Sequence, residues 1–198
     1  MCSRYEIKVP VERMIERFGL AVTDITFGAG AAGPEIRPTN SAIVIGTDAV
    51  PEILPWGLQV SWQKQPVINA RSETAADKPT FKPLLDRRVL IPASAYFEWR
   101  RDGRAKIKTR IALPTDNLFA IAGLRDDTHF VMLTCAPSEG VAHIHTRMPV
   151  ILGRDSEKEW INPDLPYDGI AALMRPFAGP FDIYEFKGAP PKQAELFG

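Results

Sequence analysis

Two segments of the chain carry apolar residues at helical spacing. In the first, PVERMIERFG, the apolar positions are Val11, Met14, Ile15 and Phe18. A proline before this run and a glycine after it are typical of a short amphipathic helix. In the second, DKPTFKPLLDRR over residues 77–88, the apolar side chains of Phe81, Leu84 and Leu85 predict the inward face of another helix.

Most other apolar residues lie in short runs rich in β-forming residues. These runs are AIVIG, VLIPASAYFEW, IKTRIAL, NLFAIAGL, HFVMLTCA, MPVIL and DIYEF. The turn-like segments PTD and RDDT separate IKTRIAL, NLFAIAGL and HFVMLTCA, which predicts an antiparallel meander. Residues 28–41 are predicted to be a loop. Because strands outnumber helices without regular alternation, the predicted fold class is α+β: a curved, largely antiparallel, barrel-like sheet with short peripheral helices.

The composition is typical of one globular domain. The chain has 198 residues, of which 45% are hydrophobic and 24% charged, and a chain of this size can bury a core without disulfides or metal. We find no internal repeat or linker, so residues 1–198 are predicted to form a single domain. No stretch is apolar and long enough to cross a bilayer or to act as a signal peptide, which predicts a cytoplasmic protein without membrane attachment.

Charge and cysteine content narrow the possible functions. The 24 basic and 24 acidic residues cancel, so any binding to nucleic acid would depend on a local patch of arginines. Of the two cysteines, Cys135 lies in an apolar run and is predicted to be buried, and no disulfide is expected. The cysteines and histidines lack the spacing of metal ligands, so we expect no metal and no cofactor.

Cys2 directly follows the initiator methionine. Removal of Met1 would leave an α-amine and a thiol on one residue, and these groups titrate at about 7.7 to 8.0 and about 8.5 in reference peptides. The amine can attack an aldehyde to form an imine, and the thiol can then close onto the imine carbon to give a thiazolidine. Taken alone, a cysteine at this position is more often an incidental residue of a frayed end.

Two internal segments hold further polar candidates. INARSET, residues 68–74, contains Asn69 and Arg71, and taken alone it is typical of a turn with solvated charges. In YFEWR, strand alternation places Glu98 on the opposite face from Phe97 and Trp99. Its carboxylate therefore faces either solvent or a cleft, where it could act as an acid or base with a raised pKa.

A third segment, AHIHTRMPVIL, contains two histidines followed by an arginine. His143 and His145 would share one face only if this segment is extended. A single histidine at the end of an element is more often a surface residue than a catalyst, unless other polar groups converge on it.

Four motifs, in this order, resemble one known family. They are MCSR at the start, INARSET, RRVLIPASAYFEW and IHTRMPVIL, with WGL at residues 56–58 as a further match. Together they resemble the SRAP (SOS response-associated peptidase) family over nearly the whole chain. Members of that family cap abasic sites in single-stranded DNA through a thiazolidine on an N-terminal cysteine. The resemblance implies the same activity here, together with an autopeptidase activity that unmasks the cysteine.

The resemblance also assigns roles to individual residues. Four are implied to be catalytic: Cys2 as the nucleophile, Asn69 in positioning the sugar and the N-terminus, Glu98 in proton transfer at the amine, and His145 in acting on the sugar oxygen. Four are implied to bind substrate: Arg4, Arg71 and Arg147 as phosphate or substrate-orienting groups, and Trp99 in contacting a base or supporting the cleft. The implied partner is single-stranded DNA containing abasic sites, and the protein is expected to be a monomer.

Two other functions could use the same residues. In a peptidase or amidase with an N-terminal nucleophile, Cys2 would attack a carbonyl and Asn69 would contribute to an oxyanion hole. In a non-covalent single-stranded DNA-binding domain, the polar residues would only line a groove and binding would depend on salt. The second alternative gives Cys2 no role.

Overall fold

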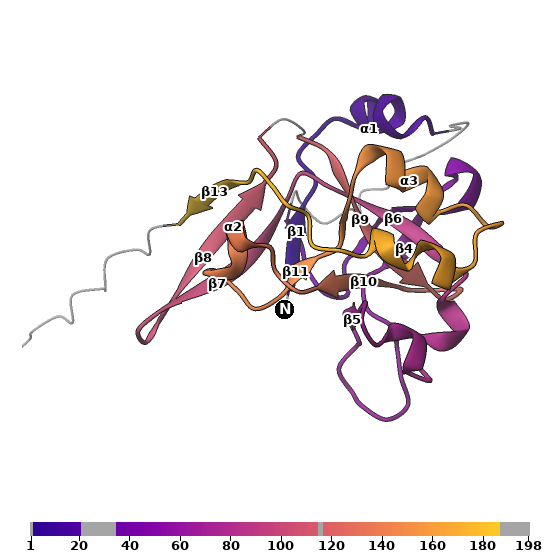
Figure 1. The fold of residues 1–198 in the computed structure, drawn as a ribbon, viewed down its shortest axis with the longest axis horizontal. Helices are drawn as coiled ribbons and strands as arrows, with labels where there is room; N and C mark the ends of the chain where they lie inside the picture. Colours follow the sequence, from indigo (N-terminus) through magenta and orange to yellow (C-terminus); the bar gives the residue numbers. More distant parts are fainter. Residues whose placement is uncertain (1, 21–34, 115–116, 187–198) are drawn as a thin grey trace, which may run out of the picture.

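Two β-sheets form most of the structure (Figure 1), a computed structural model that describes residues 2–20, 35–114 and 117–186. The first sheet has the order β13-β8-β7-β1-β2, made of β13 (Asp182–Glu185), β8 (Ala105–Ala112), β7 (Ala95–Asp102), β1 (Arg4–Glu6) and β2 (Glu35–Ile36). All four of its strand pairings are antiparallel. The N-terminal strand β1 therefore lies inside a sheet, between β7 and β2.

The second sheet has the order β11-β10-β9-β6-β3-β4, with β12 joined to β9 and β5 joined to β10. Its strands are β3 (Ser41–Ile45), β4 (Pro51–Pro55), β5 (Asn69–Arg71), β6 (Arg88–Ala93), β9 (Phe119–Arg125), β10 (Phe130–Cys135), β11 (Met148–Pro149) and β12 (Ile151–Leu152). The pairing of β5 with β10 is parallel, and the other pairings between these strands are antiparallel.

Short helices lie around the sheets. The α-helices are α1 (Val11–Phe18), α2 (Glu139–Ala142) and α3 (Arg154–Trp160), and the 3-10 helices are η1 (Thr47–Ala49), η2 (Ala75–Asp77), η3 (Lys82–Leu84) and η4 (Tyr167–Leu173). Helix α1 ends where Gly19 adopts a left-handed conformation and donates its backbone N–H to Ile15. None of the helices in the described ranges is long and apolar enough to span a membrane.

The structure confirms the α+β class, the largely antiparallel strands and helix α1. The expectation of a barrel-like sheet is wrong, because β11 and β4 end the second sheet without pairing with each other in the described part of the chain. The predicted meander is confirmed for β9 and β10, which pair antiparallel, but it is wrong for β8, which pairs with β7 and β13 in the first sheet. The loop predicted over residues 28–41 lies partly outside the described residues, and its described part includes β2.

The predicted helix over residues 77–88 is wrong as well. Its described structure consists of the end of η2, the single turn of η3 and the first residue of β6. Pro79 and Pro83 explain the difference, because each proline lacks a backbone N–H and disfavours the α conformation of the residue before it. The apolar side chains still point inward, since Phe81 and Leu84 are buried.

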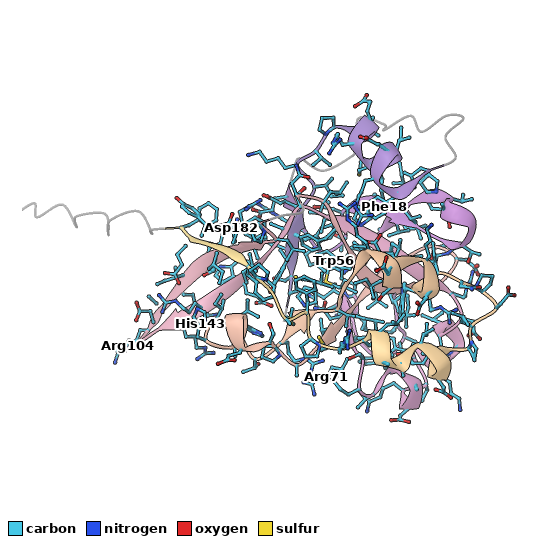
Figure 2. The ribbon with its side chains drawn as sticks, turned by 45° about the horizontal axis from the view of Figure 1, so that its top comes forward. Phe18, Trp56, Arg71, Arg104, His143 and Asp182 are labelled. Carbon is cyan, nitrogen blue, oxygen red and sulfur yellow. The ribbon has the colours of Figure 1, made fainter. Side chains whose placement is uncertain are left out.

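Trp56 joins the two sheets at the centre of the core (Figure 2). Its ring packs edge-on against Tyr5 of β1 at 5.3 Å between centroids and stacks on Phe130 of β10 at 6.3 Å. The indole Nε1 donates a hydrogen bond to the carbonyl of Ile68 at 2.8 Å. The WGL segment is therefore part of the framework that fixes β1, and with it the N-terminus, against the second sheet.

Candidate active site

Cys2 lies two residues before β1 and is fully buried. Its backbone carbonyl accepts a hydrogen bond of 2.7 Å from Nδ2 of Asn69, and its thiol donates to the carbonyl of Arg4 at 3.4 Å. Asn69 is held in turn by the parallel pairing of β5 with β10, opposite Met132. Desolvation and the nearby Glu98 carboxylate raise the pKa of the Cys2 thiol. The thiol is therefore protonated at rest and needs a base to react.

Glu98 lies on β7 with its side chain turned inward, and only 2% of its surface is exposed. Burial in the protein interior raises the pKa of this carboxyl group to about 7. Near neutral pH the group is thus present in both protonated and ionised forms, which suits a residue that first gives and then takes a proton. Of the two orientations that strand alternation allows, the structure shows the one inside the fold.

His145 approaches Glu98 from the segment after α2. Its Nδ1 lies 3.7 Å from Oε1 of Glu98 and 3.1 Å from the backbone nitrogen of Arg147. Burial lowers the pKa of His145, so the ring is neutral at pH 7. The same Nδ1 lies 3.3 Å from the backbone carbonyl of Arg147, and which of the two backbone groups it bonds depends on the tautomer of the ring. His143 is exposed in the turn that follows α2, and the segment is not extended there, so the two histidines do not act as a pair.

These groups border a polar cavity of about 360 Å³. Its lining residues are Ser3, Arg4, Glu98, Trp99, Arg101, Lys106 and His145. Four of the eight residues singled out in the sequence therefore line one pocket, and Cys2 and Asn69 are hydrogen-bonded to each other beside it. A larger cavity of about 490 Å³ lies between α3 and the segment after η4, but it contains none of these residues. The chemistry, rather than the size, identifies the smaller cavity as the candidate site.

Comparison with known proteins agrees with this arrangement. Residues 1–188 match the family described as SOS response associated peptidase (SRAP). The chain belongs to the SRAP family. It is 36% identical over 199 residues to the "abasic site processing protein YoaM" of Bacillus subtilis (strain 168), covering 89% of this chain and 86% of that protein.

Two further relatives support the assignment to the SRAP family. The "abasic site processing protein YedK" of Escherichia coli (strain K12) is 32% identical over 120 residues, covering 56% of this chain and 54% of that protein. An X-ray structure of a protein from Bacteroides thetaiotaomicron matches with a TM-score of 0.82 and 26% identity, over 94% of this chain and 92% of that chain. The fold predicted from the SRAP resemblance is thereby confirmed, apart from the barrel.

Arg4 lies at the rim of the SRAP pocket, where its guanidinium is 5.3 Å from the centre of the Trp99 ring. Its Nη1 also contacts the carboxylate of Glu35 at 2.7 Å, and Lys108 contacts the second oxygen of the same carboxylate. Although burial alone would raise it, the pKa of Glu35 is lowered by hydrogen bonds from Lys108 and Arg4. Part of the charge of Arg4 is thus balanced within the protein.

Arg147 and Arg71 lie outside the residues that line the pocket. Arg147 forms a bidentate ion pair with Glu73, with distances of 2.6 and 2.7 Å, and donates to the carbonyl of Thr134 at 2.6 Å. It thus connects the segment of His145 to the turn after β5 and to β10. Arg71 is exposed at the end of β5 (Figure 2). That either residue binds substrate stays a prediction.

Several residues near the SRAP site were not singled out in the sequence. Ser3, Arg101 and Lys106 line the pocket. The hydroxyl groups of Tyr5 and Tyr96 are buried beside Cys2 and have no hydrogen-bond partner among the described residues. Strand alternation from Trp99 could have pointed to Arg101, whereas Lys106 required knowledge of the hairpin register.

Proposed function

We propose that this protein recognises abasic sites in single-stranded DNA and bonds to them covalently through Cys2. The observation that carries the proposal is the grouping of a fixed N-terminal cysteine with a carboxyl group of pKa about 7 and a neutral histidine at one polar pocket. Its relatives YoaM and YedK are named abasic site processing proteins, which supports the same substrate. Since one chain supplies every group, we further propose that the protein acts as a monomer. A cytoplasmic location stays a prediction.

The reaction would begin once the bond between Met1 and Cys2 is cleaved, in line with an autopeptidase activity. An abasic sugar is mostly a closed ring. The neutral imidazole of His145 can accept the proton of the hemiacetal hydroxyl, and the imidazolium so formed can protonate the ring oxygen as the aldehyde forms. The free α-amine of Cys2 then attacks the aldehyde carbon. The resulting carbinolamine loses one water molecule to give an imine.

Glu98 suits both proton transfers that follow. As an acid it can protonate the departing hydroxyl group, and as a carboxylate it can accept a proton from the amine. The thiol of Cys2 then adds across the C=N bond, so that sulfur bonds to carbon and the proton ends on nitrogen. The product has the mass of protein and DNA less one water molecule, and the five-membered ring resists hydrolysis better than the imine.

A general peptidase or amidase fits the geometry less well. An oxyanion hole must aim its donor at the carbonyl of the bound substrate. Here Nδ2 of Asn69 donates to the carbonyl of Cys2 itself at 2.7 Å, which orients the nucleophile. A purely non-covalent DNA-binding domain would leave a buried, proton-exchanging Glu98 without a purpose, because an ionised carboxylate in the interior is costly to keep.

The proposal is tested by incubating protein confirmed to begin at Cys2 with a single-stranded oligonucleotide that carries one abasic site. A denaturing gel and the intact mass of the product should reveal an adduct of protein plus DNA minus water. Cys2→Ala should abolish the adduct, and Cys135→Ala, which removes the other cysteine, should retain it. An oligonucleotide with a tetrahydrofuran residue, which has no aldehyde, should give no adduct.

Two outcomes would contradict the proposal. The covalent function is wrong if wild-type protein that begins at Cys2 leaves the abasic oligonucleotide unmodified. Reversible binding that is the same for wild type and Cys2→Ala, with no adduct in either, would favour the non-covalent alternative. His145→Gln should slow adduct formation by roughly 100-fold or more, the usual contribution of a general acid or base.

A further inference from the structure

The hairpin of β7 and β8 carries two cations on neighbouring strands at the edge of the pocket. Arg101 of β7 pairs in register with Lys106 of β8, both side chains are exposed, and both line the pocket. Residues directly opposite on antiparallel strands have neighbouring side chains, and like charges in such positions destabilise the pair. Among the described residues, neither cation has an acidic side chain within ion-pair distance.

The other cations on the strands of this hairpin are balanced by acids. The pairs are Lys108 with Glu35, Arg110 with Glu6, and Arg100 with Glu185. Most of the hairpin therefore follows the usual rule that surface charges alternate in sign. The repulsion between Arg101 and Lys106 is the exception, and it is placed where the hairpin meets the cavity.

The pair also lies along an open strand edge. β1 pairs with β7 only over Ala95–Phe97, so from Glu98 onward this edge of β7 has no strand partner in the described ranges. Three residues of extended chain separate Glu98 from Arg101, a distance of about 10 Å at about 3.3 Å per residue. The two cations thus lie farther along the hairpin than Glu98, where they can reach a phosphate of a nucleotide next to the one that reacts beside Glu98.

We propose that Arg101 and Lys106 form a subsite for one backbone phosphate of the DNA strand, next to the abasic nucleotide. This inference deepens the proposed function and rests on it, because it assumes that DNA occupies the pocket. A phosphodiester between the two side chains would replace their repulsion with two attractions and would release counterions from the DNA. The hairpin projects from the body of the fold as far as Arg104 at its tip (Figure 2), and the side chains of Arg101 and Lys106 are exposed on it.

The first test measures reversible binding to an undamaged single-stranded oligonucleotide by fluorescence anisotropy at several salt concentrations. The double variant Arg101→Gln/Lys106→Gln should bind more weakly than wild type, and its plot of log K against log salt should be shallower by about 0.7, the value for one phosphate of a single strand. The control Lys82→Gln/Arg175→Gln removes the same net charge at exposed positions that do not line this pocket. The inference is overturned if the double variant keeps the wild-type slope or if the control changes it equally.

The second test locates the phosphate. Oligonucleotides with a tetrahydrofuran residue would carry one neutral methylphosphonate linkage, moved one position at a time. Wild type should bind more weakly when one particular linkage close to the tetrahydrofuran is neutral. Neutralising that linkage should not weaken binding by the double variant any further. Equal losses in both proteins at every linkage would exclude the subsite, since coupled groups are non-additive.

Two further measurements, of melting temperature and of adduct formation, distinguish failure of the phosphate subsite from failure of the covalent function. Because the substitutions remove a repulsion, the melting temperature of the double variant should be equal to or above that of wild type; a lower value would mean that the cations support the hairpin, against the inference. Failure of wild type to form an adduct with abasic DNA would remove the covalent function. The salt slopes, measured on undamaged DNA, would still decide the phosphate subsite.

Discussion

Replacing Glu98 with glutamine should stabilise the fold at alkaline pH and hardly change its stability in acid. The pKa of this carboxyl is raised from 4.5 to about 7 by burial. The folded protein therefore keeps a proton that the unfolded chain has already lost between these pH values, so wild-type stability falls as the pH rises from about 4.5 to about 7. A difference of about 2.5 pKa units, at 1.36 kcal/mol each, corresponds to about 3 kcal/mol. Glutamine does not ionise and avoids this loss.

The assay is urea unfolding of wild type and Glu98→Gln at pH 4.5 and pH 8, followed by the fluorescence of the four tryptophans. The free energy of unfolding of the variant, measured relative to wild type, should be on the order of 3 kcal/mol higher at pH 8 than at pH 4.5. Its rate of adduct formation should drop. Glu73→Gln is the control of opposite sign, because the hydrogen bond from Arg147 lowers the pKa of Glu73. The stabilisation from this hydrogen bond is present above the ordinary pKa of a glutamate side chain and is lost as the pH falls below it. An equal effect of Glu98→Gln at both pH values would refute the reasoning.

Three other substitutions or treatments test separate parts of the structure. Asn69→Ala leaves the carbonyl of Cys2 without its donor and should slow adduct formation about tenfold, as expected for about 1.4 kcal/mol; an unchanged single-turnover rate would contradict this role. Gly57→Ala should lower the melting temperature by several degrees, because φ is 121° and the new Cβ would lie 2.8 Å from Cβ of Pro66; calorimetry showing no decrease would argue against it. Burial raises the pKa of Cys135 to about 11, so mass spectrometry should find this thiol unalkylated by iodoacetamide at pH 8 until the protein unfolds.

The longer strands were predictable because local patterns determine them. The runs that became β6, β7, β9 and β10 are rich in β-branched and aromatic residues, and each extends over at least six residues. The strands that the sequence did not reveal include β1, β2 and β5, which have two or three residues each. Such strands are too short to show alternation and exist only because a distant partner supplies the hydrogen bonds.

The sequence predicted which residues belong to the candidate site but not how they are arranged. The position of Cys2 and the four separated motifs indicated which side chains matter, but the orientation of Glu98 remained open between solvent and cleft. The approach of His145 to Glu98 and the anchoring of Arg147 by Glu73 depend on contacts between segments that are far apart in the sequence. The unbalanced pair at the hairpin depends on register, which the sequence did not specify.

The central position of β1 has a consequence for when the protein becomes reactive during synthesis. Asn69 donates to the carbonyl of Cys2, Glu98 acts on its thiol and His145 lies 3.7 Å from Glu98. Strand β1 itself pairs with β7. A growing chain must therefore emerge at least as far as residue 145 before the site around Cys2 is complete. Contacts that close loops of this length form slowly. Until then the thiol of Cys2 has the solvent environment of an unfolded chain. The chemistry of the site thus depends on synthesis of the first 145 of the 198 residues.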